Sequence, residues 1–593
     1  MNLQWLDWLI IAAYFLVSLA VGLAGFKKAG SSAEEFFASG RNMPWWLLGI
    51  SMVATTFSAD TPNLVTDMVR QHGVAGNWLW WAFLLTGMIT VFVYARLWRR
   101  SHVLTDIEFY ELRYSGRTAA FLRGFRALYL GVFFNTVIMA AVLLASIKIG
   151  GVMLGMSPVR TVAAVSVITV VYTMLGGLKA VLLTDLVQFV IAMAGSISAA
   201  YVVVHLPEVG GLSALFAHPQ VAGRISILPD FSDSATLMAV FIVPLAVQWW
   251  SVWYPGAEPG GGGYIAQRML AARNEDHATG ATLLFNIAHY ALRPWPWIVV
   301  ALSSLIVYPD LASLQSAFPD IDAGIMRHDL AYPAMLTRLP TGLLGLVVAS
   351  LIAAVMSTIA THLNWGASYI VNDFYRRFLR HGAPERELVR AGRLSTLLLM
   401  AAAAVVALYL SNALQAFNIL LQVGAGTGLL FLLRWFWWRI NAASEISAMI
   451  ISFAVAVYFE FLHGRMGFAA LTDWQKLIIG VAVTTVGWVL VTVCTRPDDP
   501  QTLLRFYRKV TPGGPGWRRI LQRAGDQGED TAGLLAQEWN VPRALLQSFL
   551  GVALVYGGLF ALGFWLYGNL APACIAAIVA ALASAALIRV RTQ

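Results

Sequence analysis

The sequence has little charge. Charged residues make up only 12% of the 593 residues, whereas hydrophobic residues make up 59%. A typical soluble domain is about one quarter charged, because it must cover its core with a polar surface. This composition excludes a set of ordinary soluble domains and favours a chain whose solvent is a lipid bilayer.

Cysteine and catalytic motifs are also scarce. The two cysteines, Cys494 and Cys574, lie in apolar runs and cannot form a disulfide framework. The sequence contains neither an H-E-x-x-H zinc motif nor a G-x-S-x-G nucleophile motif. We therefore expect no enzymatic activity and no organic cofactor.

Long apolar runs are abundant. A helix needs about 20 predominantly apolar residues to cross the hydrocarbon core of a bilayer. Roughly fifteen runs suit that purpose. They cover residues 6–26, 43–70, 77–98, 119–149, 159–176, 181–205, 236–256, 279–307, 341–372, 391–411, 414–438, 444–463, 475–494, 545–567 and 571–590. The predicted fold class is therefore an all-α polytopic membrane protein.

The basic residues lie in alternate loops. Arginines gather within residues 96–126, 376–393 and 505–523, whereas residues 206–235 and 308–340 are poor in cations or acidic. This is the positive-inside pattern of membrane proteins. We expect a multi-pass protein of the plasma (inner) membrane with its N-terminus outside and its C-terminus in the cytoplasm. The net charge of +9 then needs no nucleic-acid partner.

The second apolar run carries a proline. Pro62 has no N–H for the carbonyl of Ser58, and its ring crowds that carbonyl, so we expect the helix to unwind there. Carbonyls from Ala54 to Ser58 then become available as cation ligands. The alternative is an ordinary proline kink in which nearby hydroxyls satisfy the backbone.

A stripe of small and hydroxyl-bearing residues lies within the ninth run. Ala354, Ser357, Thr358 and Thr361 have the spacing i, i+3, i+4 and i+7, which places them on one helical face. Such a face offers oxygen ligands for a cation. It is also typical of a close helix-packing surface.

Isolated polar side chains lie in other apolar runs. Asp185 is costly inside a bilayer and indicates either a functional carboxylate or a structural pair with Lys179. Asp60, Asp67, Arg293 and Gln422 lie in spans that can converge on one small-molecule pocket. An internal ion pair between Arg293 and Asp60 is the structural alternative.

Several motifs occur in one order along residues 1–470. They are Glu35 to Arg41, Thr105 to Tyr114, Gly176 to Ala180 with Thr184-Asp185, Tyr264 to Arg268, Ala354 to Asn364, Asp373 to Tyr375 and Trp435 to Arg439. In this order and context the chain resembles the sodium:solute symporter family, which includes sodium/glucose, sodium/proline and sodium/sialic acid transporters.

The resemblance implies a LeuT-like core of two five-helix repeats of inverted topology, with about five additional transmembrane helices. The charge pattern agrees, because the broken span 43–70 and its counterpart 236–256 run in opposite directions. Gly256, Pro259 and Gly260 to Gly263 interrupt the counterpart near its cytoplasmic end. The expected division is 1–42 (extra helix and loop), 43–235 and 236–440 (the repeats), 441–495 (additional helices), 496–544 (cytoplasmic loop) and 545–593 (C-terminal helices).

The resemblance also implies a sodium site. It maps onto the carbonyls of Ala54, Phe57 and Ala354 and the hydroxyls of Ser357 and Thr358. Some relatives hold a second sodium, for which this chain offers Asp185, Ser357 and Thr361. Those relatives have a further hydroxyl where this chain has Ala360.

Substrate residues follow the family pattern less closely. Sugar-transporting relatives place a glutamine and an acid where this chain has Thr61 and Trp80. Another sugar or a glycoside can still stack on Trp80 and Trp81. The alternative is a zwitterion or carboxylate held by Arg293.

We therefore expect a secondary active transporter that couples sodium entry to uptake of a small organic solute by alternating access. The solute classes to consider are a sugar or glycoside, an amino acid and a carboxylate. One alternative is a proton-coupled carrier in which Asp60 or Asp185 titrates. Another is a transporter-like sensor or a channel.

Overall fold

A computed structural model describes residues 3–24, 32–252, 258–319, 321, 326–410, 424–536 and 539–592. Within these residues the regular elements are helices, accompanied by a single isolated β-bridge between Met43 and Ala272. Ten helical stretches in the described residues are long and apolar enough to cross a membrane, and four shorter apolar helices accompany them. The prediction of an all-α polytopic membrane protein is confirmed.

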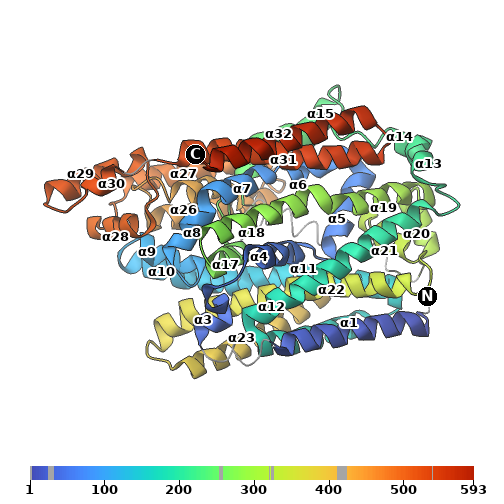
Figure 1. Cartoon of the computed structure of the whole chain (residues 1–593), viewed down its shortest axis with the longest axis horizontal. Helices are drawn as coiled ribbons and strands as arrows, with labels where there is room; N and C mark the ends of the chain where they lie inside the picture. Colours follow the sequence, from blue (N-terminus) through green and yellow to red (C-terminus); the bar gives the residue numbers. More distant parts are fainter. Residues whose placement is uncertain are drawn as a thin grey trace.

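The principal helices run roughly along one direction (Figure 1). Those of the N-terminal half are α1 (Trp5–Ala24), α3 (Ala33–Ala38), α4 (Trp45–Thr56), α5 (Asp60–His72), α6 (Trp78–Trp81), α7 (Leu84–Ile89), α8 (Ala95–Ser101), α9 (Phe109–Arg113), α10 (Gly116–Leu128), α11 (Asn135–Leu154) and α12 (Pro158–Val204). Those that follow are α16 (Val243–Ala246), α17 (Gly263–Ala271), α18 (Glu275–Ile287), η8 (Ala288–Leu292), α19 (Pro294–Val307), α22 (Leu343–Ser368), α23 (Glu385–Tyr409), α26 (Ala442–Val457), α27 (Asp473–Cys494), α28 (Pro500–Val510), α29 (Arg518–Asp526), α30 (Ala532–Leu535), α31 (Val541–Leu566) and α32 (Leu570–Thr592).

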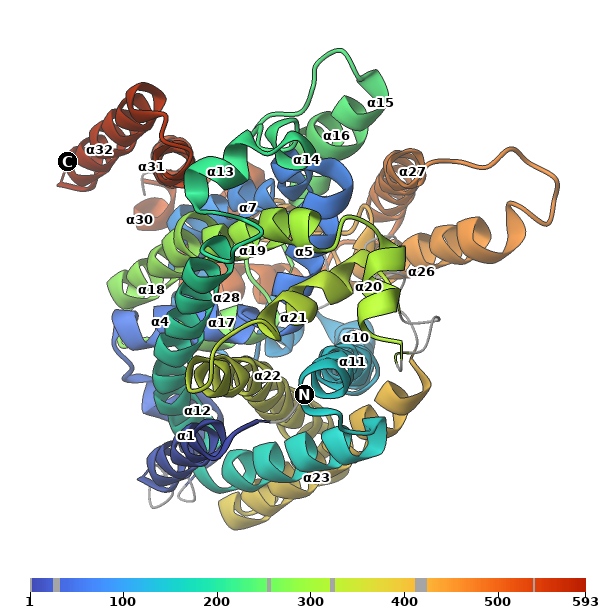
Figure 2. The same ribbon diagram turned by 90° about the vertical axis from the view of Figure 1, so that its right-hand side faces the viewer.

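The centre of the bundle is built around α22. This helix packs against α12, α11 and α4, and an end-on view shows it surrounded by neighbours (Figure 2). The last two helices, α31 and α32, form a hairpin on one outer side, where α31 contacts α7 and η8. The buried face of α22 therefore lies where segments distant in the sequence meet.

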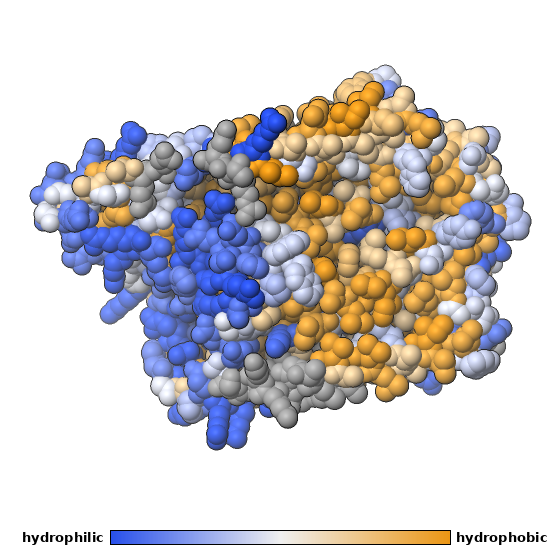
Figure 3. Space-filling model, in the orientation of Figure 1, coloured by the Kyte–Doolittle hydropathy of each residue, from blue (hydrophilic) through white to orange (hydrophobic). Residues whose placement is uncertain are grey.

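Hydrophilic and hydrophobic residues separate on the surface. The face in Figure 3 carries an apolar expanse over its middle and right, and hydrophilic residues gather at the end formed by α3, α9, α10 and α28 to α30. That end holds the arginine-rich segments of the sequence. The apolar expanse is the surface that a bilayer would cover.

The predicted break in the second span is present, but it lies before the proline. Helix α4 ends at Thr56, and α5 begins at Asp60. Pro62 is the third residue of α5, in the first turn, where its missing N–H removes no helical hydrogen bond. The break therefore covers Phe57 to Ala59 and does not depend on a displaced Ser58 carbonyl.

Two other interruptions differ in detail from the expected spans. Helix α12 joins the predicted spans 159–176 and 181–205 through Gly177, whose φ of 58° favours glycine. In the second repeat, regular helix α16 ends at Ala246, earlier than the predicted interruption at Gly256 to Gly263, and α17 resumes at Gly263. The Gln248 side chain, in a short 3₁₀ helix (Gln248–Trp250), donates a hydrogen bond of 2.6 Å to the carbonyl of Leu79, which holds this segment against α6.

Candidate functional site

The broken helix and the hydroxyl-bearing helix meet in the buried centre of the bundle. The Thr358 hydroxyl of α22 donates to the carbonyl of Thr55 on α4 at 2.7 Å. A second contact joins the hydroxyls of Thr55 and Thr361 at 3.0 Å. Because all three side chains are buried, these contacts connect the end of α4 to α22 away from solvent.

The five predicted sodium ligands lie at or beside this junction. Ala54 and Phe57 are at the end of α4, and the Ala354 carbonyl accepts a hydrogen bond of 3.1 Å from Thr358. Ser357 is the neighbour of Thr358 on α22. The set offers three carbonyl and two hydroxyl oxygens, which are the neutral hard ligands that suit an alkali cation.

Asp185 of α12 supports the same junction. One carboxylate oxygen accepts a hydrogen bond of 2.6 Å from Ser357, and the other accepts one of 2.5 Å from Ser51 of α4. The described residues contain no ion pair between Asp185 and Lys179, which was the structural alternative. The carboxylate instead joins α12 to both helices of the predicted sodium site.

A buried arginine reaches the residues considered for a second cation. The Arg268 guanidinium of α17 donates to Thr361 at 2.7 Å and to Ser51 at 3.2 Å, and it lies 3.8 Å from Asp185. Its positive charge partly balances Asp185. The positions considered for a second sodium, Asp185 and Thr361, therefore already face a cation that belongs to the protein.

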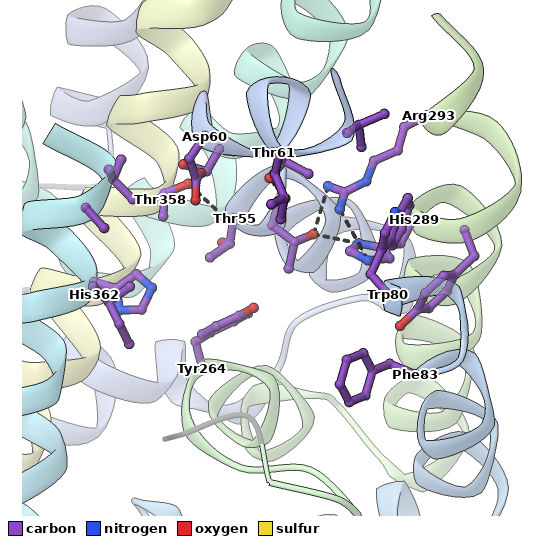
Figure 4. A pocket seen from close by; sticks show the side chains of 18 of the residues that line it. Thr55, Asp60, Thr61, Trp80, Phe83, Tyr264, His289, Arg293, Thr358 and His362 are labelled. Carbon is purple, nitrogen blue, oxygen red and sulfur yellow. Dashed lines mark hydrogen bonds between the residues drawn. The ribbon is translucent and has the colours of Figure 1, made fainter. Parts of the chain in front are cut away.

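A cavity adjoins the junction between α4 and α22 (Figure 4). It is lined by Thr55, Thr56, Ser58, Asp60, Thr61, Leu64, Val65, Trp80, Phe83, Val137, Ile138, Ala141, Val142, Tyr264, His289, Tyr290, Arg293, Thr358 and His362. These residues come from helices of both predicted repeats. Thr55 and Thr358 belong to the cavity wall and to the junction alike, so the two predicted sites share a boundary.

The polar end of the cavity is organised around Arg293. Its guanidinium donates to the Thr56 hydroxyl at 3.1 Å and contacts Nε2 of His289 at 3.2 Å. His289 Nδ1 in turn contacts the Thr56 hydroxyl at 3.1 Å. Figure 4 shows Arg293 and His289 together on one side of the cavity.

The predicted substrate residues divide into those in the cavity and those outside it. Asp60, Thr61, Trp80 and Arg293 line it. Trp81 is fully buried and packs against Trp78 and Trp80 instead, because the helical turn of α6 directs neighbouring side chains in different directions. Gln422 lies outside the described residues.

Three cavity residues had no role in the sequence prediction. His289 lies four residues before Arg293, on the same helical face, and that spacing was a usable signal. Tyr264 belongs to the motif Tyr264 to Arg268, which resembles the family but carried no predicted role for this side chain. His362 follows Thr361 directly, and its inward position depends on how α22 packs against α11, through Asn135.

Comparison with known proteins identifies a family that the chain resembles over most of its length. The model of the sodium:solute symporter family matches residues 36–452. A sodium/glucose cotransporter of Vibrio parahaemolyticus is 24% identical over 522 residues, covering 84% of this chain and 93% of the relative. Sodium/glucose cotransporter 1 of Oryctolagus cuniculus is 27% identical, covering 84% of this chain and 80% of the relative.

A solved structure shares the fold. It is the substrate-bound outward-open state of a Na⁺-coupled sialic acid symporter, with 18% sequence identity, a TM-score of 0.65, and coverage of 84% of this chain and all of that chain. This likeness confirms the predicted LeuT-like architecture. Because the family model spans well over half of the sequence, the chain belongs to the sodium:solute symporter family and couples the entry of sodium to the uptake of a small organic solute.

Proposed function

We propose that sodium binds between the broken helix and α22, and that the solute binds in the adjoining cavity. The sodium ligands are the carbonyls of Ala54, Phe57 and Ala354 and the hydroxyls of Ser357 and Thr358. The observation that carries this proposal is the 2.7 Å hydrogen bond from Thr358 to Thr55, which brings both sets of oxygens to one place. A cation there replaces hydrogen bonds between the helices with ion–oxygen contacts.

The negative charge near the site comes from Asp185, which contacts the proposed ligand Ser357. Asp185 accepts a hydrogen bond of 2.6 Å from the Ser357 hydroxyl. This bond increases the negative partial charge on the Ser357 oxygen that faces the cation. Asp185 thus supports sodium binding through Ser357. Arg268 offsets part of this charge, so we assign Asp185 and Thr361 to the support of one sodium site rather than to a second ion.

Coupling follows from the shared wall of the two sites. Sodium holds the end of α4 against α22, and both segments line the solute cavity through Thr55 and Thr358. If sodium favours the solute-binding state by about 1–3 kcal/mol, solute affinity rises about 5–150-fold, and solute raises sodium affinity equally. The membrane potential adds about 2.3 kcal/mol per charge per 100 mV to the inward driving force.

The arrangement in the membrane follows the charge pattern. We place the arginine-rich end in the cytoplasm of a cell with a plasma (inner) membrane, and the N-terminus outside. The repeats occupy residues 43–235 and 236–440, and solute passes between them by alternating access. The relatives include a sodium/glucose cotransporter, a sodium/mannose cotransporter and a Na⁺-coupled sialic acid symporter, so sugars, amino acids and carboxylates are all solutes to test.

The decisive experiment measures binding of radioactive sodium to the purified protein. We expect saturable binding in the wild type and its loss in the double variant Ser357→Ala/Thr358→Ala, because two of the five ligands are removed. Replacement of sodium by choline at fixed pH should abolish solute uptake in proteoliposomes. Full sodium binding by the double variant would overturn the site, and uptake that persists in choline and follows pH would favour proton coupling.

A further inference from the structure

Two opposite charges line the solute cavity without pairing with each other. Asp60 is the first residue of α5, and Arg293 directly precedes α19. Among the described residues neither has an ion-pair partner, although both line the same cavity. The ion pair expected as the structural alternative is therefore not formed.

Some other buried arginines in the described part of the chain have carboxylate partners. Arg434 lies 3.3 Å from Glu445, and Arg126 pairs with Glu258. An unpaired charge inside a bilayer protein is expensive, and proteins that keep one generally use it. Arg70 and Arg113 are also buried without an ion pair among the described residues, but they donate to backbone carbonyls and lie outside the cavity lining. Arg293 differs from them because it shares a cavity with an unpaired carboxylate.

The guanidinium of Arg293 is held in place by neutral groups. Its side chain is 1% exposed, and Nη1 and Nη2 contact Thr56 and His289. Its Nε has no hydrogen-bond partner. The rings of Trp297 and Phe57 lie 5.3 and 6.0 Å from the guanidinium carbon. These contacts fix the position of the cation, and no described carboxylate lies within ion-pair distance of it.

The carboxylate of Asp60 likewise has no ion-pair partner among the described residues. Its Oδ1 is buried without a hydrogen-bond partner, and the amino end of α5 favours negative charge at this position. Trp80 and Tyr290 stack with ring centroids 5.7 Å apart in the wall of the same cavity. Both rings also pack against His289, at centroid distances of 5.5 and 4.4 Å, so this aromatic wall lies near Arg293 and offers an apolar surface beside that end of the cavity (Figure 4).

Much of the remaining lining is apolar. Leu64, Val65, Val137, Ile138, Ala141 and Val142 offer no side-chain hydrogen bonds. A neutral sugar carries hydroxyls around its whole ring, and those that face these residues would lose water without a replacement partner. A solute with charge at its ends and an apolar middle avoids this loss.

We propose that the solute is a zwitterion, with its cationic nitrogen at Asp60 and its carboxylate at Arg293. This inference rests on the proposed function, because it assigns the solute to the same cavity. The solute bridges two charges that the protein keeps apart. Its apolar portion contacts the aliphatic and aromatic wall between them.

The first test uses the wild-type protein and matched ligands. Thermal unfolding of the purified, sodium-loaded protein is measured with each of the twenty L-amino acids, glycine betaine, D-glucose and D-galactose. We expect at least one zwitterion to raise the unfolding temperature and the two sugars to have no effect. For the best amino acid, we expect the amide and the N-acetyl derivative, which each keep one charge, to bind about tenfold or more weakly.

The second test uses variants of similar shape. Asp60→Asn and Arg293→Gln should each weaken binding of that amino acid by about tenfold or more. Asp67→Asn, which alters another α5 carboxylate outside the cavity lining, should leave it unchanged. Where a variant does not fold, the derivative series on the wild type decides the question.

The outcomes separate the two proposals. If no zwitterion raises the unfolding temperature, whether or not a sugar does, the zwitterion inference is overturned. Equal binding of the amino acid, its amide and its N-acetyl derivative also overturns it. In those cases, sodium binding that depends on Ser357 and Thr358 would still support the proposed sodium site. Sodium binding that does not depend on these two residues would overturn the sodium site, whatever the solute class.

Discussion

The Thr358 hydroxyl donates a hydrogen bond of 2.7 Å to the carbonyl of Thr55, and this bond joins α22 to the end of α4 where the helix breaks. Thr358 also donates to the Ala354 carbonyl, at 3.1 Å, within its own helix. One hydroxyl therefore serves both segments that the proposed sodium site uses. The Ala354 carbonyl and the Thr358 hydroxyl are both proposed sodium ligands, so a bound cation competes with the hydroxyl proton for the Ala354 oxygen and changes how the two helices are held.

Substitution of Thr358 tests this relationship directly. Thr358→Val keeps the shape but removes the oxygen, so we expect sodium affinity to fall at least about tenfold. Thr358→Ser keeps the oxygen and should stay close to the wild type. Ser350→Ala serves as the control, because the Ser350 hydroxyl bonds the Val347 carbonyl of α22. Equilibrium binding of radioactive sodium measures all three, and a normal affinity in Thr358→Val would remove Thr358 from the site.

Loss of the Asp185 charge should destabilise the protein as well as weaken sodium binding. Asp185→Asn leaves Arg268 as a buried cation without its counter-charge, a change that typically costs about 3–5 kcal/mol. The double variant Asp185→Asn/Arg268→Gln should recover part of this loss, because it removes both charges together. Thermal unfolding of the four proteins forms a double-mutant cycle, and strictly additive effects would contradict the coupling.

We expect the buried pair of Arg126 and Glu258 to close one route from the cavity. A second, smaller cavity shares Thr56, Tyr264 and His289 with the first and is bounded by Glu258. We expect Glu258→Gln to open this route by removing the ion pair that ties α10 to the segment before α17. Residues farther along this route belong to the arginine-rich end of the protein.

Thiol labelling measures this opening. The exposed Cys494 and Cys574 are first replaced by serine, and Ala141→Cys then places a thiol in the cavity wall. A membrane-impermeant reagent added from the arginine-rich side should react faster in the Glu258→Gln background. Glu529→Gln breaks an exposed pair with Arg508 and should change nothing. Equal labelling rates in the two backgrounds would show that the Glu258 pair does not close the route.

Stability should depend on pH through Asp106, which lies between α8 and α9. Burial, with a smaller contribution from nearby Glu258, raises the pKa of Asp106 to about 7 from its ordinary value of 3.8. The folded protein therefore binds this proton more tightly than the unfolded chain. The stabilisation is fully present below about pH 4 and is lost as pH rises through about 7, amounting to on the order of a few kcal/mol.

Asp106→Asn should remove this part of the pH dependence. The amide can still accept from the Gly263 N–H, and its NH₂ group can donate to Tyr369, the two current partners. We expect the variant to be more stable than the wild type above pH 7 and close to it near pH 4. Thermal unfolding across that range makes the comparison, and parallel curves for the two proteins would assign the pH dependence to other groups.

Patterns within one helix were predictable from the sequence. The spacing of Ser357, Thr358 and Thr361 indicated one face, and these side chains do turn toward α4, α12 and α17. The apolar runs likewise gave the membrane helices, because the length needed to cross a bilayer is fixed. Such features depend on local geometry and not on the choice of neighbour.

Contacts between distant helices were not predictable in the same way. The position of Arg268 beside Asp185 depends on where α17 begins after the break, and no spacing in the sequence encodes that. Trp80 and Trp81 are adjacent, yet only Trp80 reaches the cavity, because the local turn and the neighbouring Tyr556 and Trp78 decide which side chain faces inward. The packing of distant helices therefore decides which side chains face the cavity, and the composition of a span does not.

The helix break near Pro62 was expected correctly, but Pro62 is not its cause. The sequence suggested that Pro62 breaks the helix, but the break lies at Phe57 to Ala59, and Pro62 lies in the first turn of α5. A residue there makes no N–H hydrogen bond within the helix, so Pro62→Ala removes little from the folded state. Its main effect is greater freedom of the unfolded chain, worth about 0.4–1 kcal/mol.

We therefore expect Pro62→Ala to keep both the break and sodium binding, with a small decrease in unfolding temperature. Thr66→Pro is the matched contrast. It places a proline in the next turn of α5, where the N–H of residue 66 can bond the carbonyl of Pro62, so it should cost about 3 kcal/mol or more. Sodium binding and thermal unfolding of both variants decide the matter. A loss of sodium affinity in Pro62→Ala would show that the proline itself maintains the broken geometry on which the ion site depends.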